Sequence, residues 1–165
     1  MGDGHGLELG GGEELMHSET ALTHPLKQAL QSAMPQSQVF KLSDRTTVGI
    51  PDLSVNWGGT IWLEVKATES ERLEYHRNWI KQLRSCRRLE LVANNCYFVV
   101  YQEVHGRCSV SLVKPSQIGE DLSIGHRAAM FVDKPFNHAA VATFVKQELL
   151  DRWTSLFAAQ SSPRS

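Results

Sequence analysis

The sequence predicts an α/β fold, more narrowly an α+β domain with a mixed sheet, on three observations. Runs of alternating apolar and polar residues between glycine-containing turns are typical of strands. Apolar residues that recur every three or four positions are typical of amphipathic helices. With 165 residues, 41% hydrophobic and 21% charged, the chain has the size and composition of one globular domain. The expected order of elements is α-β-β-β-α-β-β-α.

Three helices are expected from apolar residues at helical spacing. They cover Thr20 to Ala33, about Glu71 to Ala93, and Asn137 to Phe157. The first ends before Pro35, because proline cannot continue a helix, and Asn94 and Asn95 are suited to end the second. The third carries one apolar stripe, made of Val141, Phe144, Val145, Leu149, Trp153 and Leu156. This stripe either covers the sheet or forms the interface of a homodimer.

Five strands are expected from residue alternation and turn signals. They cover Gln38–Leu42, Asp52–Trp57, Thr60–Val65, Cys96–Val104 and Ser109–Val113. Gly58 and Gly59 separate the second strand from the third, and His105 and Gly106 separate the last two. Glycine tolerates the positive φ of a tight turn, so each of these pairs predicts a β-hairpin.

The ends of the chain are expected to lie outside the folded domain. Residues 1–15 are rich in glycine and acidic side chains and lack apolar periodicity, so they are interpreted as a disordered leader. A single domain is expected over residues 16–160, followed by a disordered tail over 161–165. No apolar run approaches the roughly 18 residues that span a membrane. Three cysteines without a C-x-x-C pair favour the reducing cytoplasm over a disulfide framework.

Positive charge is concentrated in the second expected helix, although the whole chain has a net charge of −1. Between Arg72 and Arg88 there are six Lys or Arg residues and one Glu, a local charge of 6 − 1 = +5. A solvated helix face is the ordinary explanation for such a run. The excess of one sign favours contact with a phosphate backbone instead. The candidate DNA-contacting residues on this helix are Arg77, Lys81, Arg84 and Arg88.

One group of residues is suited to catalysis. It lies in two segments, G-I-P-D-L around Asp52 and W-L-E-V-K ending at Lys66. Antiparallel pairing across the glycine turn brings Asp52, at the start of one strand, close to Glu64 near the end of the other. Lys66 lies two residues after Glu64 and therefore on the same face of the strand. Val65 points to the opposite face, into the core, and its carbonyl oxygen remains available as a ligand.

These residue types suit the hydrolysis of a phosphodiester bond. Two carboxylates with water molecules form the oxygen shell that Mg²⁺ prefers, so Asp52 and Glu64 are candidate metal ligands. A bound cation polarises the phosphate and lowers the pKa of a bound water, while the Lys66 ammonium positions that water or stabilises the developing charge. Solvated surface charges are the common alternative. Chance would give P-D and E-x-K at a suitable distance only about 0.01 times in a chain of this size, which favours the functional interpretation.

The two segments resemble the motifs of the PD-(D/E)xK nuclease superfamily, and of its VRR-NUC branch in particular. The resemblance covers roughly Thr20 to Lys114 and is specific at the two motifs. It implies a restriction-endonuclease-like αβββαβ core, here with an extra C-terminal strand and helix. It also implies a Mg²⁺ or Mn²⁺ ion held by Asp52 and Glu64, with Lys66 as the catalytic lysine.

The same resemblance suggests two further residues. The family often carries a glutamate on the first helix, and Glu19 is the candidate for that position, as a metal ligand in addition to Asp52, Glu64 and the Val65 carbonyl. On the second helix the family often has a glutamine where this chain has His76. His76 is therefore a candidate contact to a phosphate or to a metal-bound water.

Three functional hypotheses follow. The first is a Mg²⁺-dependent deoxyribonuclease, an endonuclease that is structure-specific or phage-related. The second is a catalytically silent DNA-binding protein of the same fold, which is disfavoured because Asp, Glu and Lys fill all three catalytic positions. The third is a soluble domain with a fortuitous motif, which would not bind Mg²⁺. A homodimer is expected with the first hypothesis, since cutting both strands of a duplex takes two metal centres.

Overall fold

The structure, a computed structural model, describes residues 19–42, 49–73, 77–93, 95–119, 130–132 and 137–160. The leader over 1–15 and the tail over 161–165 that the sequence predicts lie outside this part of the chain. His76 and the side chain of Arg77, two of the candidate DNA contacts, also lie outside it.

A six-stranded sheet forms the centre of the fold, with its strands in chain order from β1 to β6. The strands are β1 (Gln38–Lys41), β2 (Leu53–Asn56), β3 (Thr60–Thr68), β4 (Cys96–Val104), β5 (Arg107–Val113) and β6 (Met130–Val132). β3 and β4 are parallel, and the other neighbouring pairs are antiparallel. The sheet is therefore mixed, as the sequence predicts.

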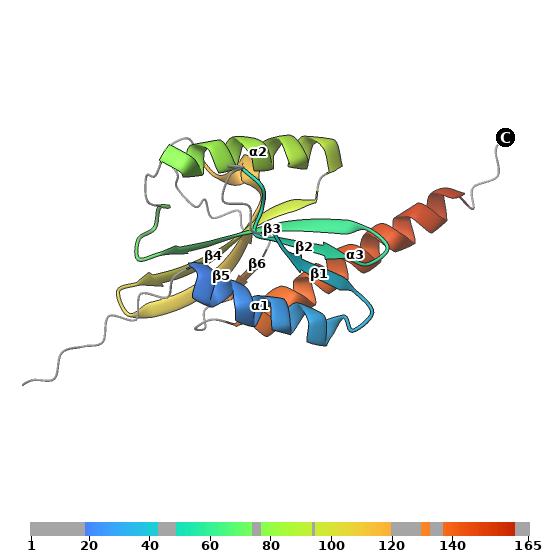
Figure 1. The fold of residues 1–165 in the computed structure, drawn as a ribbon, viewed down its shortest axis with the longest axis horizontal. Helices are drawn as coiled ribbons and strands as arrows, with labels where there is room; N and C mark the ends of the chain where they lie inside the picture. The colour runs from blue at the N-terminus through green and yellow to red at the C-terminus, as the bar shows by residue number, and fades with distance from the viewer. Residues whose placement is uncertain are drawn as a thin grey trace, which may run out of the picture.

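Helices cover both faces of this sheet (Figure 1). They are α1 (Glu19–Ala33), α2 (Arg77–Ala93) and α3 (His138–Gln160), with a short 3₁₀ helix, η1 (Pro115–Gln117). α2 covers one face and connects the parallel strands β3 and β4, which need such a crossover connection. α1 and α3 lie on the opposite face. The order α1-β1-β2-β3-α2-β4 is the predicted αβββαβ core, so the predicted fold class is confirmed.

The sheet separates two apolar cores, and β3 contributes side chains to both. Ile61, Leu63 and Val65 are buried in the core between the sheet and the helices α1 and α3. Trp62 packs in the core on the α2 face. Because residues two positions apart share a face of a strand, Glu64 and Lys66 lie on the α2 face of the sheet.

The second helix starts later than predicted. α2 begins at Arg77 rather than near Glu71. Ahead of it, Thr68 Oγ1 donates a hydrogen bond to the Arg72 carbonyl at 2.8 Å, and the Arg72 amide donates one to Ser70 Oγ at 3.1 Å. Local hydrogen bonds of Ser and Thr to the backbone compete with those of a helix. This competition is the physical reason why the described residues before 74 are not helical.

Three further differences concern the sheet and its connections. β3 continues to Thr68, beyond the predicted end at Val65, because it pairs with β4 as far as Gln102. β5 begins at Arg107 instead of Ser109. β6 and η1 were not predicted, since each has three residues, too few to show a periodic pattern.

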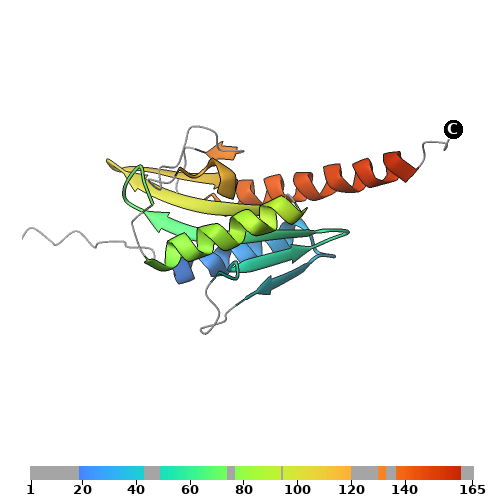
Figure 2. The same cartoon turned by 90° about the horizontal axis from the view of Figure 1, so that it is seen from above.

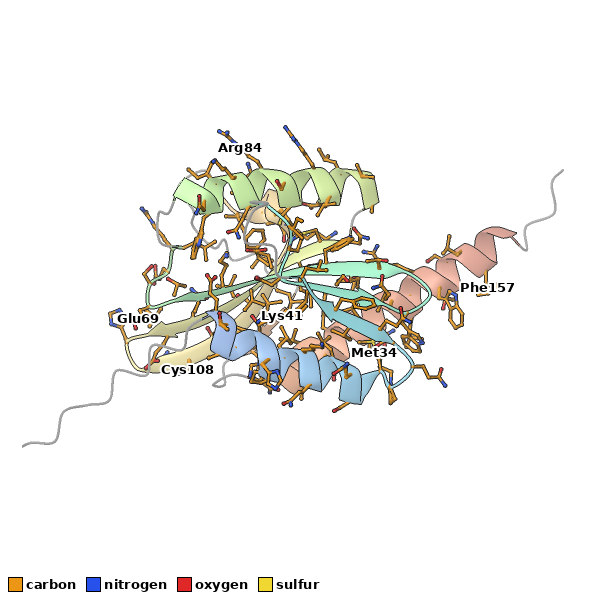
Figure 3. The ribbon with its side chains drawn as sticks, in the orientation of Figure 1. Met34, Lys41, Glu69, Arg84, Cys108 and Phe157 are labelled. Carbon is orange, nitrogen blue, oxygen red and sulfur yellow. The ribbon has the colours of Figure 1, made fainter. Side chains whose placement is uncertain are left out.

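The C-terminal part of α3 extends beyond the sheet (Figure 2). One half of its predicted stripe is buried in the core: Val141, Val145 and Leu149. Phe144 is partly buried against the same core. The last two residues of the stripe, Trp153 and Leu156, are 47 and 57% exposed, together with the nearby Phe157 (Figure 3). The homodimer stays a prediction, and this exposed half, the C-terminal end of the stripe, is the surface on which it depends. In the part of the chain that the structure describes, no helix is long and apolar enough to cross a membrane.

Candidate active site

The hairpin of β2 and β3 places Asp52 opposite Glu64. Leu53 pairs with Leu63 at the open end of this hairpin, and one further step outward in the same register sets Asp52 against Glu64. At the closed end Gly58 has a φ of 65°, the left-handed conformation that glycine adopts without strain. The turn and the register together give the proximity of the two acidic residues that the sequence predicts.

The carboxylate of Asp52 is held by the strand that carries Glu64. Its Oδ2 accepts a hydrogen bond from the backbone amide of Val65 at 2.8 Å. The pairing of β2 with β3 ends at Leu53 and Leu63. Continued by two residues, the same register would set Pro51 opposite Val65, and proline has no amide hydrogen to donate. The ladder therefore supplies no donor to the Val65 carbonyl at this position, which suits the ligand role that the sequence analysis gives to this oxygen.

Lys66 shares a face of β3 with Glu64 and is as deeply buried. Both side chains are 1% exposed, and Lys66 Nζ lies 2.8 Å from Glu64 Oε1. Glu19, the first residue of α1, reaches the same ammonium group, with its Oε1 and Oε2 each 3.4 Å from Nζ. The Glu19 side chain is 38% exposed. The cluster therefore meets the solvent on the side of Glu19.

Two residues of α2 that the sequence did not connect with the site lie at it or beside it: Trp79 contacts Lys66, and Ser85 lies against the segment that leads to Asp52. The ring of Trp79 has its centroid 4.8 Å from Lys66 Nζ. Ser85 lies against Gly49, where a φ of 111° and the close approach of the helix leave no room for a side chain. A glycine three residues before Asp52 is a signal that could have pointed to this approach. For Trp79 no local pattern distinguishes this role from ordinary packing.

Burial dominates the electrostatics of the cluster. Desolvation raises the pKa of Glu64 to about 7, although the Lys66 ammonium acts to lower it. Desolvation also raises the pKa of Asp52, against the hydrogen bond from the Val65 amide. Burial by itself lowers the pKa of Lys66, but the carboxylates of Glu64 and Glu19 outweigh this effect and leave that pKa above its usual 10.5. Lys66 is therefore charged at neutral pH, where Glu64 titrates.

Without metal, the protein is expected to lose stability as the pH rises from about 4.5 to about 7. Glu64 has a pKa of about 7 in the folded chain against an ordinary 4.5. The folded chain therefore binds this proton more tightly, and the free energy of unfolding falls as the proton is released. Glu64→Gln removes the titrating group and should flatten this part of the curve. Urea unfolding of both proteins at several pH values measures the effect, and an equally steep decline in Glu64→Gln would contradict it.

The donor atoms of the site fit a hard divalent cation. Neither carboxylate oxygen of the buried Glu64 accepts a well-directed hydrogen bond, although Oε1 lies within ion-pair distance of Lys66. Together with Asp52 and the Val65 carbonyl, Glu64 offers the oxygen ligands that Mg²⁺ and Mn²⁺ prefer. Among the residues that the structure describes, no three His, Cys, Asp or Glu side chains are arranged to hold a metal. The donors in place are therefore two carboxylates and one backbone oxygen, while Glu19 forms its ion pair with Lys66.

Three of the four basic residues expected to contact DNA lie on the exposed side of α2: Lys81, Arg84 and Arg88. Arg84 points away from the sheet (Figure 3). Arg87 on the same helix has a structural role instead, since it donates hydrogen bonds to the carbonyls of Pro115 and Ile118 at 3.1 and 2.7 Å.

Comparison with known proteins gives a similarity of fold. No family model matches the sequence, and no curated protein matches it. Among solved structures, the chain is similar to Hjc, a Holliday junction resolvase from the archaeal hyperthermophile Archaeoglobus fulgidus, with 13% sequence identity and a TM-score of 0.45. The match covers 74% of this chain and 98% of that chain.

Proposed function

We propose that the protein is a metal-dependent endonuclease that hydrolyses phosphodiester bonds of DNA. The observation that carries this proposal is the cluster of Asp52, Glu64 and Lys66 on one hairpin, with the last two buried. Burying charged groups costs free energy that their attraction often does not recover, and shifted pKa values gather at functional sites. A catalytic role therefore explains this buried cluster better than a contribution to folding stability does. The resemblance to PD-(D/E)xK motifs points to the same three residues.

Each residue has a role in this proposal. Asp52 and Glu64 hold a Mg²⁺ or Mn²⁺ ion with the Val65 carbonyl, and Glu19 is the proposed additional ligand. When bound, the ion polarises the phosphate and lowers the pKa of a water molecule. Lys66 places its ammonium group beside the phosphate and stabilises the negative charge of the transition state. The hydrogen bond from the Val65 amide orients Asp52, and burial keeps bulk water away from Glu64.

The proposal is tested by incubating the protein with linear, flapped and four-way DNA in the presence of Mg²⁺, Mn²⁺ or EDTA. Cleavage of at least one substrate with metal, and of none with EDTA, is the expected result. The comparison of substrates also tests whether the endonuclease is structure-specific. Binding of DNA without cleavage under all conditions would favour the catalytically silent DNA-binding protein. Neither binding nor cleavage, with no Mg²⁺ bound in calorimetry, would leave a soluble domain with a fortuitous motif.

DNA binding is expected to depend on the exposed basic row of α2, formed by Lys81, Arg84 and Arg88. Replacing all three by alanine should weaken binding of every DNA sequence similarly, because phosphates carry no sequence information. The salt dependence of the binding constant should flatten by about one unit of slope for each side chain that no longer neutralises a phosphate. Fluorescence anisotropy at several salt concentrations measures this slope.

The matched control for this row removes basic residues elsewhere, with Lys27→Ala on α1 and Lys146→Ala on α3 combined. These positions lie on the opposite side of the sheet from α2, so their removal should leave the slope nearly unchanged. An unchanged slope in the α2 variant would place the DNA on another surface.

A further inference from the structure

We infer that Trp79 is a positioning residue that seats the ammonium group of Lys66 in the candidate active site; the inference rests on the proposed function. Lys66 Nζ lies 4.8 Å from the centroid of the Trp79 ring, inside the distance of about 6 Å at which a cation is attracted to an aromatic face. The Lys66 side chain is 1% exposed. The ring therefore acts on an ammonium group that is largely removed from water, where this attraction is strongest.

The ring differs in kind from the other partners of Lys66. Glu64 Oε1 at 2.8 Å and the Glu19 oxygens at 3.4 Å are also the oxygen donors that a divalent cation would take. Lys66 and a metal ion are both cations, so they compete for these carboxylates. The face of Trp79 attracts the ammonium through its quadrupole and offers no lone pair that a hard cation would use. It can therefore hold Lys66 in the site without lowering the affinity for metal.

The position of Trp79 is itself fixed by the fold. Trp79 lies in the first turn of α2, is half-buried and packs against the apolar core that α2 covers. Lys66 comes from β3, whose pairing with β4 extends on both sides of this residue. The distance between ring and ammonium is thus set by the docking of α2 on the sheet. The docking of α2 fixes the Trp79 ring, and the ring in turn fixes the position of the Lys66 ammonium group.

The first test needs no activity and uses the protein without metal. Urea unfolding is measured for the wild type, Lys66→Met, Trp79→Leu and the double variant. If ring and ammonium interact, the unfolding equilibrium constants should deviate from additivity by about 5- to 30-fold, the range expected for a desolvated pair. Trp153→Leu is the control, because this exposed tryptophan lies on α3. It should show no deviation when combined with Lys66→Met.

The second test separates positioning from structure in the cleavage reaction. Trp79→Leu should lower kcat on the order of 10- to 100-fold with little change in KM, because a displaced group loses mainly transition-state stabilisation. Trp79→Phe keeps an aromatic face and should retain most of the activity. In the Lys66→Met background, Trp79→Leu should cause no further loss. If Trp79→Leu does not fold, Trp79→Met, which also lacks an aromatic face, takes its place in the same comparison.

The outcomes distinguish this inference from the proposed function. Additive unfolding effects, or an equal further loss of kcat in the Lys66→Met background, would overturn the role of Trp79. Non-additive unfolding with no cleavage by the wild type would overturn the proposed function and leave the interaction between Trp79 and Lys66 standing. Non-additivity in both measurements supports the inference as stated.

Discussion

Replacing Asp52 or Glu64 by alanine is expected to remove Mg²⁺ binding and DNA cleavage together. Asp52 and Glu64 are the two carboxylates in place as donors, so the loss of either leaves one of them with the Val65 carbonyl and with Glu19, whose carboxylate is paired with Lys66. DNA binding without metal should survive or become tighter, because the removal of one carboxylate reduces the electrostatic repulsion of the phosphates. Lys66→Ala should behave differently. Both carboxylates remain, so metal should still bind while cleavage falls on the order of 10²- to 10³-fold.

Lys66→Arg is expected to restore little of this activity. A planar guanidinium cannot replace a compact ammonium group, and the buried position between Glu64 and Trp79 leaves it little space. Calorimetric Mg²⁺ titration and a nicking assay measure binding and cleavage separately. Asp151→Ala and Lys146→Ala, both on α3, are controls for the loss of a charge away from the site. Undiminished cleavage by Asp52→Ala and Lys66→Ala would refute the nuclease assignment.

Gly49→Ala is expected to destabilise the protein and to displace the segment that carries Asp52. Gly49 has a φ of 111°, and a Cβ added there would lie 2.9 Å from the Ser85 Cβ and closer still to its hydroxyl. The left-handed backbone costs about 1 to 2 kcal/mol in a residue with a Cβ. The steric conflict adds about 1 to 3 kcal/mol. Cleavage should fall as well, since Asp52 follows only three residues later.

Two variants separate these contributions. Gly106→Ala carries a similar backbone penalty, with a φ of 72°, but a Cβ there would meet nothing within 4 Å. Gly106→Ala should therefore lower the free energy of unfolding less than Gly49→Ala does. Ser85→Gly removes both atoms that conflict with the added Cβ and leaves the Lys81 carbonyl at 3.7 Å, an ordinary contact. Combined with Gly49→Ala, it should recover the steric part of the loss in unfolding free energy and in cleavage. Equal losses in Gly49→Ala and Gly106→Ala would show that the approach of α2 is unimportant.

The arrangement of Asp52, Glu64 and Lys66 follows from the sequence alone. A glycine turn fixes the register of a hairpin within a few residues, and the two-residue period of a strand fixes which side chains share a face. Both rules are local. They place Asp52 opposite Glu64 and set Lys66 on the same face as Glu64, and the structure has these relations. The periodicity of the three helices, and the apolar run of β4 ahead of the turn at His105 and Gly106, made these elements predictable from local sequence as well.

The surroundings of these residues were decided by tertiary structure. Glu19 is 47 residues from Lys66 in the sequence, and Trp79 lies on a different element, so no local rule brings them together. The shift in the pKa of Glu64 has the same kind of origin, since burial causes it and burial depends on what packs above a strand.

The two halves of α3 show most directly what a sequence pattern does not determine. Helical spacing predicted one continuous apolar stripe, and a helix of 23 residues is about 34 Å long. A pattern along the helix carries no information about how far the sheet beneath it extends. Val141, Val145 and Leu149 are buried in the core beneath the sheet. Trp153, which lies against Gly58 in the turn between β2 and β3, and Leu156 stay about half exposed. Periodicity determines which side of an element is apolar, and only the packing of the whole chain determines what that side meets.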